Sequence, residues 1–295
     1  MNENRPIFAL MYDFDKTLSP KDMQEYGFIP GIKMEAEEFW AKCNEMMVKN
    51  NMDQILAYMY VMCKQARGKM LFTRETLQAL GKDVKLFDGV KTWFKRVNDY
   101  ADKRGMEARH YIISSGLKEI IEGTPIAKEF DGIFAAEFCY DDCGEPCWPA
   151  MAVNFTSKTQ FLFRINKGIM DVTDNRRLNE YMPEDKRPVP FRNMVYIGDG
   201  LTDVPCMKLV RANGGHSIAV YQEEKNAVND LIIQGRVDLV LPADYSKGKA
   251  LEKAVFAYVD EAAAKNASVR LHIESIERAQ AEKEREKREA WERAK

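Results

Sequence analysis

The chain of 295 residues carries 44 Lys and Arg against 46 Asp and Glu, a formal net charge of -2, which gives no reason to expect nucleic acid or an anionic membrane as a partner. A small-molecule ligand is the better expectation. No stretch approaches the roughly 18 apolar residues of a membrane span, and the first residues lack a secretory pattern, so we expect a cytoplasmic protein. Its six scattered cysteines are then expected to be reduced thiols.

The first predicted strand, residues 6–12 (PIFALMY), is apolar almost throughout, which is typical of a strand covered on both faces. Similar apolar runs follow at 108–115, 193–199, 216–221 and 237–243. Helical patterns lie between them, including residues 89–105 with one apolar face and residues 157–168, which end on a glycine. The alternation predicts an α/β fold with a doubly wound, Rossmann-like, mostly parallel sheet.

Residues 19–87 interrupt this alternation, because they show two amphipathic helical patterns and a shorter third one but no strand. The insertion would leave the carboxyl end of the first strand, where open α/β sheets bind their ligands. We therefore expect an all-helical cap (19–87) over a catalytic core formed by residues 1–18 and 88–245. Within the core, residues 131–155 predict two strands around a Gly/Pro turn.

The end of the chain differs in composition from the core. Residues 246–265 predict an amphipathic helix, and residues 266–295 are mostly charged, with few apolar side chains after Ile276. Such a segment forms either a solvated helix with many ion pairs or a frayed tail. It gives no indication of the oligomeric state.

Two carboxylates, Asp13 and Asp15, follow the first predicted strand in the segment MYDFDKTLS. Side chains at positions i and i+2 of a strand leave on the same side, so these carboxylates are expected to lie close together. Their repulsion is relieved by a divalent cation, and hard oxygen ligands beside a phosphate suit Mg²⁺. Two aspartates at this spacing can also serve as a helix cap and a turn residue. The catalytic interpretation therefore needs support from other residues of the chain.

That support comes from polar groups at later strand ends and helix starts, namely Ser114, Ser115, Gly116, Lys158, Asp199 and Asp203. A carboxylate that attacks an anionic phosphomonoester is repelled by it. The site therefore needs fixed positive charge, hydroxyl and amide donors, and a metal ion. Lys158, Ser114 and the amides near Gly116 supply the charge and the donors, and Asp13 and Asp199 supply metal ligands. These residues point to phosphoryl transfer.

The segments DFDKT, ISSG, SKT and GDGLTD, in this order, resemble the four motifs of the haloacid dehalogenase (HAD) superfamily. The helical insertion between the first two motifs is similar to that of the phosphoserine phosphatase-like branch. The motifs span residues 13–203, and the resemblance in fold would reach about residue 245. It implies Mg²⁺-dependent hydrolysis of a small phosphomonoester through an aspartyl-phosphate.

The resemblance also implies separate roles for the two aspartates. Asp13 would be the nucleophile, and Asp15 would protonate the leaving oxygen and then activate the hydrolytic water. Thr17 would steady the loop around Asp15. Dehalogenases lack the second aspartate because a halide needs no proton, whereas this sequence retains it, as phosphatases and phosphomutases do.

The remaining motif residues would bind phosphate and hold one another. The resemblance implies that Ser114 binds a phosphoryl oxygen, with Ser115 and Gly116 beside it, and that Lys158 neutralises Asp13 and the phosphate. Taken alone, Ser115 is equally compatible with capping the following helix, and Lys158 with an ordinary surface position.

For the metal, the resemblance implies an Mg²⁺ site formed by Asp13, Asp199 and the backbone carbonyl of Asp15. Asp203 would act through a coordinated water or by holding Lys158. On the residues alone, Asp203 is also compatible with a simple helix cap.

The residues that select the substrate cannot be chosen from the sequence. Phosphoserine phosphatases carry a glutamate early in the cap, and Asp22 stands near that place here, which argues against phosphoserine as the substrate. Other side chains that could meet the leaving group are Lys16, Arg67 and Arg74. Trp40, Tyr58 and the methionines of the cap are interpreted as packing residues.

Two other functions remain open at this stage. The chain could be a phosphotransferase or phosphomutase of the same fold, or a non-catalytic binding protein that uses its C-terminal helix. A zinc site at Cys139, Cys143 and Cys147 is not expected, because a fourth ligand is missing and the spacing is unusual.

Overall fold

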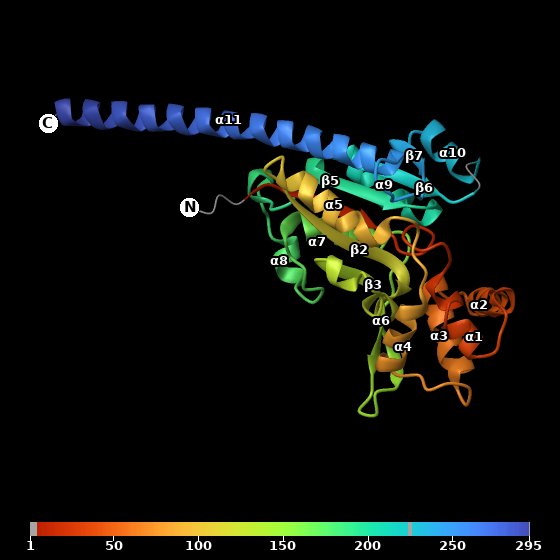
Figure 1. The fold of residues 1–295 in the computed structure, drawn as a ribbon. Coiled ribbons are helices and arrows are strands. Elements are labelled where there is room, and N and C mark those ends of the chain that lie inside the picture. The colour runs from red at the N-terminus through yellow and green to blue at the C-terminus, as the bar shows by residue number, and fades with distance from the viewer. Residues whose placement is uncertain (1–4, 224–225, 295) are drawn as a thin grey trace.

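The computed structural model describes residues 5–223 and 226–294, and these residues form a seven-stranded sheet with the order β4-β3-β2-β1-β5-β6-β7 (Figure 1). Neighbouring strands are parallel except β3 and β4, which are antiparallel. The strands are β1 (Ile7–Tyr12), β2 (Glu107–Leu117), β3 (Gly132–Tyr140), β4 (Pro146–Met151), β5 (Met194–Gly198), β6 (His216–Tyr221) and β7 (Leu239–Pro242). The predicted α/β fold with a mostly parallel, Rossmann-like sheet is confirmed.

Both faces of the sheet are buried, as the apolar strands predict. Along β1, Phe8 and Leu10 belong to one core cluster and Ala9 and Met11 to the other, because successive side chains of a strand point to opposite faces. The first cluster is covered by α5 (Val90–Asp102) and the first turns of α11 (Ala250–Arg293). The second is covered by α7 (Thr159–Lys167), α9 (Val204–Ala212) and α10 (Asn226–Ile233).

Several local predictions are confirmed. Helix α7 ends at Gly168, which has the left-handed φ of 68° expected of a glycine at a helix C-terminus. The two strands expected in residues 131–155 are β3 and β4. Shorter helical elements complete the core, namely α6 (Lys118–Glu122), α8 (Asn175–Asn179), η3 (Ala127–Glu129), η4 (Glu184–Lys186), η5 (Phe191–Asn193) and η6 (Leu201–Asp203).

The described structure has helices but no strand between residues 19 and 87. The elements are η1 (Met23–Glu25), α1 (Phe28–Gly31), α2 (Ala36–Asn50), α3 (Gln54–Ala66), α4 (Arg74–Leu80) and η2 (Gly81–Asp83). Asp53 begins α3 by accepting hydrogen bonds from two backbone amides, and a capping box at Thr73 begins α4. The apolar faces of these helices bury Phe39, Met59 and Leu77 in the same cluster as α5, so the insertion packs directly on the core.

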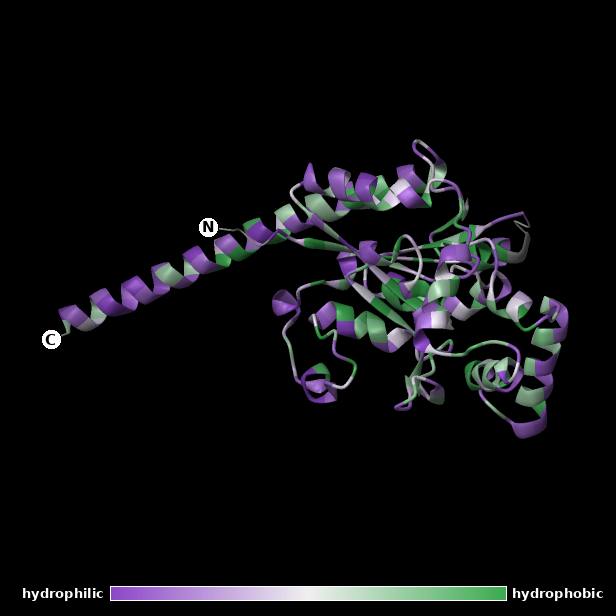
Figure 2. Cartoon of the chain, turned by 60° about the horizontal axis from the view of Figure 1, so that its bottom comes forward, coloured by the Kyte–Doolittle hydropathy of each residue, from purple (hydrophilic) through white to green (hydrophobic). Residues whose placement is uncertain are grey.

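Helix α11 has 44 residues, and only its first third is buried. Its distal part extends away from the sheet and is mostly hydrophilic (Figures 1 and 2). Ion pairs one turn apart stabilise this part, for example between Arg285 and Glu289 and between Arg288 and Glu292. Of the two alternatives for residues 266–295, the solvated helix is therefore the one observed over residues 266–293, and residue 295 lies outside the described residues.

Within the described part of the chain, no helix combines the length and the apolar character that crossing a bilayer requires. The cytoplasmic location stays a prediction.

Candidate active site

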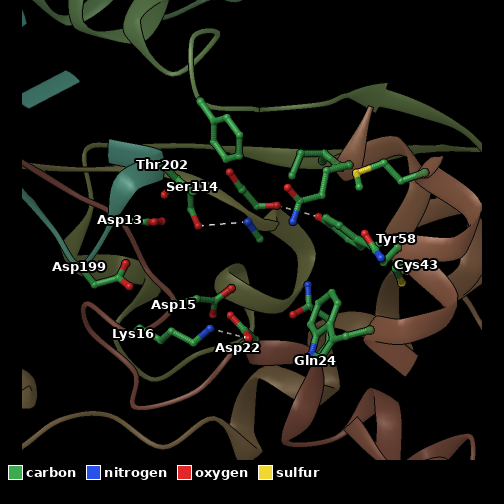
Figure 3. A pocket seen from close by; sticks show the side chains of 18 residues that line it. Asp13, Asp15, Lys16, Asp22, Gln24, Cys43, Tyr58, Ser114, Asp199 and Thr202 are labelled. Carbon is green, nitrogen blue, oxygen red and sulfur yellow. Dashed lines mark hydrogen bonds and ion pairs between the residues drawn. The ribbon is translucent and has the colours of Figure 1, made fainter. Parts of the chain in front are cut away.

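The residues selected from the sequence meet at the carboxyl ends of the parallel strands. They surround a cavity of about 580 Å³ that lies between the sheet and the helical insertion (Figure 3). Its core side is lined by Asp13, Asp15, Ser114, Ser115, Gly116 and Asp199. Asp13 and Asp15 follow β1, Asp199 follows β5, and the other three lie among the last residues of β2. This edge of the sheet is where parallel α/β folds place their ligands.

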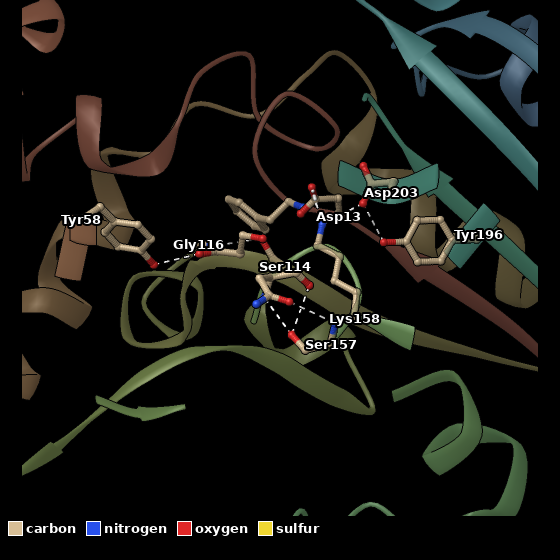
Figure 4. A network of polar contacts seen from close by, with 11 residues as sticks. Asp13, Tyr58, Ser114, Gly116, Ser157, Lys158, Tyr196 and Asp203 are labelled. Atoms are coloured by element: carbon tan, nitrogen blue, oxygen red, sulfur yellow. Dashed lines mark hydrogen bonds and ion pairs between the residues drawn. The ribbon is translucent and has the colours of Figure 1, made fainter. Parts of the chain in front are cut away.

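Lys158 joins two of the carboxylates beneath this cavity (Figure 4). Its Nζ lies 2.9 Å from Asp13 Oδ2 and 2.7 Å from Asp203 Oδ1, and its side chain is fully buried. The hydroxyl of Tyr196 also donates to Asp203 Oδ1, at 2.8 Å. The surface-lysine alternative for Lys158 is therefore wrong. Asp203 stands at the start of α9 but makes no side-chain cap bond, so the helix-cap alternative is wrong as well.

The cluster holds more negative than positive charge. Burial alone lowers the pKa of Lys158, but the charges of Asp13 and Asp203 raise it well above its usual range. Burial, opposed by Lys158, raises the pKa of Asp203 to about 6. Burial, reinforced by Asp203 and Asp13, raises the pKa of Asp199 to about 8. One lysine does not balance three close carboxylates, and the site favours a further cation.

The three carboxylates fit a divalent metal ion. Asp13, Asp199 and Asp203 each offer an oxygen within 4.8 Å of the others, and these are hard ligands. Asp203 Oδ2 is buried without a hydrogen-bond partner, so it has an unused lone pair. A Cβ at position 198 would lie 2.4 Å from this oxygen, which explains the glycine that ends β5.

Both carboxylate oxygens of Asp13 accept a hydrogen bond. Its Oδ2 accepts from Lys158, and its Oδ1 accepts from the backbone amide of Phe14 at 2.7 Å. Its own backbone amide donates to the carbonyl of Ile197 in β5. The carboxylate is thus fixed in orientation at the floor of the cavity.

Asp15 has a different environment from Asp13. Its Oδ1 accepts from the backbone amide of Met23, at 2.8 Å, which ties it to the start of the insertion. Burial, then the charges of Asp22 and Asp13, raise the pKa of Asp15 well above its usual value. A Cβ at Gly116 would lie 2.1 Å from Met23 Cε and 3.0 Å from Asp15 Oδ2, so a larger residue here would displace the end of the Met23 side chain and crowd Asp15. The raised pKa favours the protonated form of Asp15.

The end of β2 presents a serine hydroxyl to the site. Ser114 is fully buried, and its Oγ accepts from the amide of Gly116 at 3.1 Å. Ser115 Oγ is buried without a partner, and the Ser115 carbonyl accepts from the hydroxyl of Tyr58 at 2.8 Å. Because the N-cap residue of α6 is Leu117, the alternative that Ser115 caps this helix is wrong.

Of the four side chains suggested to contact the leaving group, two line the cavity and two do not. Lys16 and Asp22 line the cavity and form an ion pair of 2.9 Å. Arg74 instead pairs with Glu137, and neither Arg74 nor Arg67 lines the cavity. The two arginines are therefore not brought to the site.

Thr17 contributes to the loop around Asp15 through its backbone. Its carbonyl accepts from the hydroxyl of Tyr245 at 2.9 Å, and its own hydroxyl is buried without a partner. The backbone of Thr17 therefore holds this loop, and the Thr17 hydroxyl forms no hydrogen bond.

Sequence reasoning missed part of the cap wall. Trp40 and Tyr58 were interpreted as packing, yet both line the cavity, together with Gln24 and Phe155. The amphipathic position of Trp40 was visible in the sequence, but the directions of the Trp40 and Tyr58 side chains depend on how α2 and α3 pack on the core. No short motif marks Gln24. The cysteines at 139, 143 and 147 do not form a metal cluster in the described residues.

Comparison with known families identifies the class of protein. A family model for haloacid dehalogenase-like hydrolases matches residues 10–208, which contain every residue of the cluster described above. The chain belongs to this family, and the membership expected from the four motifs is confirmed.

Among individual proteins, the chain is similar to an uncharacterised protein of Borreliella burgdorferi, with 28% identity over 282 residues that cover 85% of this chain and 96% of that protein. The fold is similar to that of a probable phosphoserine phosphatase from Vibrio cholerae, with a TM-score of 0.56, 12% identity, and coverage of 90% of this chain and 69% of that one. A substrate-bound phosphoserine phosphatase structure gives a TM-score of 0.52, 14% identity, and coverage of 80% and 93%. The expected resemblance in fold to the phosphoserine phosphatases is thus confirmed.

Proposed function

We propose that this protein is a phosphatase that hydrolyses a small phosphomonoester with Mg²⁺ through a phosphorylated Asp13. The observation that carries the proposal is the contrast between two neighbouring aspartates. Asp13 is paired with a buried lysine, whereas the pKa of Asp15 is raised. One carboxylate is suited to attack and the other to carry a proton.

In this proposal Asp13 Oδ1 or Oδ2 attacks phosphorus and forms an acyl phosphate. Lys158 and the Phe14 amide keep the attacking carboxylate in place, which removes part of the entropy that attack would otherwise cost. Lys158 also offsets the repulsion between the carboxylate and the anionic substrate. Ser114, with Ser115 and Gly116 beside it, binds the oxygens of the transferred group.

Asp15 first donates a proton and later accepts one. As an acid, it protonates the oxygen that leaves from phosphorus, and the raised pKa of Asp15 favours the protonated form that this step needs. As a carboxylate afterwards, it takes a proton from the water that hydrolyses the acyl phosphate. The Met23 amide holds this side chain in place through both steps.

Asp13, Asp199 and Asp203 are the residues that would hold Mg²⁺, with the backbone carbonyl of Asp15. The ion would neutralise charge on the carboxylates and the phosphate. Asp203 has a second task in the proposal, because its other oxygen holds Lys158 in position.

We further propose that residues 1–18 and 88–245 form the catalytic core, residues 19–87 the cap, and residues 246–295 a C-terminal helix and charged tail. The hydrogen bond from the Tyr58 hydroxyl to the end of β2 supports a cap that packs against the phosphate site. A seated cap excludes water from the cavity and so limits access to small phosphomonoesters.

The first test is release of p-nitrophenol from p-nitrophenyl phosphate in the presence of Mg²⁺. D13N is expected to lose at least about a thousandfold in kcat, because the attacking group is gone. D142N, at an exposed aspartate of the β3–β4 turn, is the matched control and is expected to retain wild-type activity. Equal rates for D13N and wild type would refute the proposal.

A second measurement separates a phosphatase from a phosphotransferase. Added glycerol competes with water for the acyl phosphate, and the product is then glycerol phosphate. A phosphatase is expected to release inorganic phosphate almost exclusively. Predominant transfer to the alcohol would assign the chain to the transferase class instead.

A further inference from the structure

The hairpin formed by β3 and β4 carries three cysteines outside the candidate active site. Cys139 lies in β3, Cys147 lies in β4, and Cys143 lies in the turn between the two strands. This turn is the yellow-green loop at the bottom of the view in Figure 1, away from the body of the sheet. Cys143 and Cys147 are exposed and Cys139 is half-buried, so small reagents in solution can reach the hairpin.

Two of the three sulfur atoms are already in contact. Cys139 Sγ and Cys147 Sγ are 3.3 Å apart, and Cys147 Sγ also lies 3.4 Å from the carbonyl oxygen of Cys139. A disulfide bond is about 2.0 Å long, so the two sulfur atoms have to approach by about 1.3 Å, which rotation about the side-chain bonds can supply. The backbone spacing is suitable as well, because adjacent strands lie about 4.8 Å apart and disulfides join Cα atoms about 4.4–6.8 Å apart.

An irregularity in the strand pairing brings these two thiols together. The register pairs Cys139 with Trp148 and Tyr140 with Pro146. Cys147 is therefore an extra residue between two paired positions, which is the arrangement of a β-bulge. In a regular strand Cys147 would point to the opposite face from Trp148, and so away from Cys139. The bulge redirects its side chain, and the two sulfur atoms meet.

Hydrogen bonds hold the hairpin in this conformation. On either side of Cys139, the Phe138 amide and the Tyr140 hydroxyl donate to Glu119 Oε1, at 3.0 and 2.6 Å. The turn is closed by Asp141, whose Oδ1 accepts from two backbone amides of the turn at 2.9 and 3.0 Å. Because these contacts order the hairpin before any reaction, joining the two thiols costs little further conformational entropy.

The cysteines outside the hairpin compete poorly for an oxidant. The attacking species is the thiolate, and burial raises the pKa of Cys43 to about 12 and the pKa of Cys63 to about 11. Burial also raises the pKa of Cys206 well above its usual value. Within the hairpin, the hydrogen bond with Cys139 is the largest cause of the raised pKa of Cys147. Cys147 therefore keeps its proton while Cys139 reacts first.

We propose that Cys139 and Cys147 are a modification site, at which a small-molecule disulfide converts the two thiols reversibly into a disulfide bond. The Cys139 thiolate attacks one sulfur of the reagent, which forms a mixed disulfide and releases one small thiol. The Cys147 thiolate then attacks Cys139 Sγ and releases the second small thiol. The two cysteines lose two electrons to the reagent, and their two protons pass to the released thiolates. This inference is independent of the proposed phosphatase function.

The test treats the full chain with bis(2-hydroxyethyl) disulfide, which is neutral and so is not repelled by the acidic side chains of the turn. After an acid quench and blocking of free thiols, cleavage before Asp141 separates Cys139 from Cys147, and tandem mass spectrometry identifies the joined cysteines. With about 0.1 mM of the free thiol present, the Cys139–Cys147 bond is expected to exceed mixed disulfides at Cys139 by at least about tenfold, because the effective concentration of a tethered thiol is millimolar or higher. Mixed disulfides as the main product would overturn the inference.

The same chain unfolded in urea is the matched control. Pairing of Cys143 with either of the other two cysteines closes a shorter loop, so the unfolded chain is expected to give a mixture of pairings. An identical mixture from the folded protein would overturn the inference, because the fold would then not direct the bond.

The variant C143S removes the competing thiol of the turn and is expected to retain the Cys139–Cys147 bond. Loss of this bond in folded C143S would contradict the assignment. Excess dithiothreitol is expected to restore both thiols in the wild type, and a bond that resists it would refute the proposed reversibility.

Discussion

Replacing Lys158 with methionine tests whether the buried lysine holds the carboxylates of the site together. Methionine keeps most of the length of the side chain and removes the charge. The lysine contacts Asp13 at 2.9 Å and Asp203 at 2.7 Å, and it is fully buried. K158M therefore leaves both acids in place without their shared cation.

The expected size of the effect follows from these distances. The carboxylate oxygens lie within 4.8 Å of one another, and at an effective dielectric constant near 20 two such charges repel by about 3.5 kcal/mol. Removing one partner of a buried ion pair generally costs about 3–5 kcal/mol. Both arguments give a loss of about 3–5 kcal/mol in the free energy of unfolding.

The assay is urea unfolding at neutral pH with a chelator present, so that no metal ion screens the acids. The double variant K158M/D203N removes one of the two charges that the single variant leaves unpaired, so it is expected to be more stable than K158M, with a coupling of about 3 kcal/mol. K64M, at an exposed lysine of α3, is the control. A K158M protein as stable as wild type, or strict additivity in the double variant, would refute the reasoning.

The remaining predictions concern packing and pH. Burial lowers the pKa of His110 to about 3, and an unfolded histidine titrates near 6.5, so the unfolded state binds more protons between these values and stability falls as pH falls from 6.5 towards 3. From pH 7 to pH 5 the His110 contribution is about 2 kcal/mol, and unfolding curves of H110Q at the two pH values should lack this part of the decline. An added methyl at Gly123 would lie 1.7 Å from the Gln78 carbonyl oxygen, where α6 meets α4. G123A is therefore expected to lose about 1–3 kcal/mol by thermal or urea unfolding, whereas G31A, where a methyl meets only ordinary contacts, is the control, and equal losses in both would contradict the packing argument.

Much of the core side of the site was predictable because it depends on local rules. Asp13 and Asp199 each follow an apolar strand, Ser114 lies near the end of another, and parallel strands bring their carboxyl ends to one edge. Once the strands were assigned, the meeting of these residues followed. Lys158 was found through its place in the order of motifs, although its burial between two acids was not predicted.

The cap side was not predictable to the same degree. Helical periodicity placed Trp40 on an apolar face, and Tyr58 was interpreted as a packing residue, but periodicity cannot say whether an apolar face meets the core or a cavity. Gln24 lies in a short turn of helix with no pattern of its own, and its burial arises from the packing of the whole insertion. Arg67 and Arg74 show the opposite error. Both were suggested as contacts of the leaving group, but tertiary packing keeps both away from the cavity.

The central claim, a phosphoryl group carried by Asp13, is tested most directly by trapping it. Wild-type protein is mixed with Mg²⁺ and p-nitrophenyl phosphate, quenched in acid during turnover, and reduced with borohydride, which converts an acyl phosphate to an alcohol. Peptide mass spectrometry is expected to find homoserine at position 13 of the wild type and not in protein quenched without substrate. Unmodified Asp13 during active turnover, or reduction at another carboxylate instead, would contradict the account.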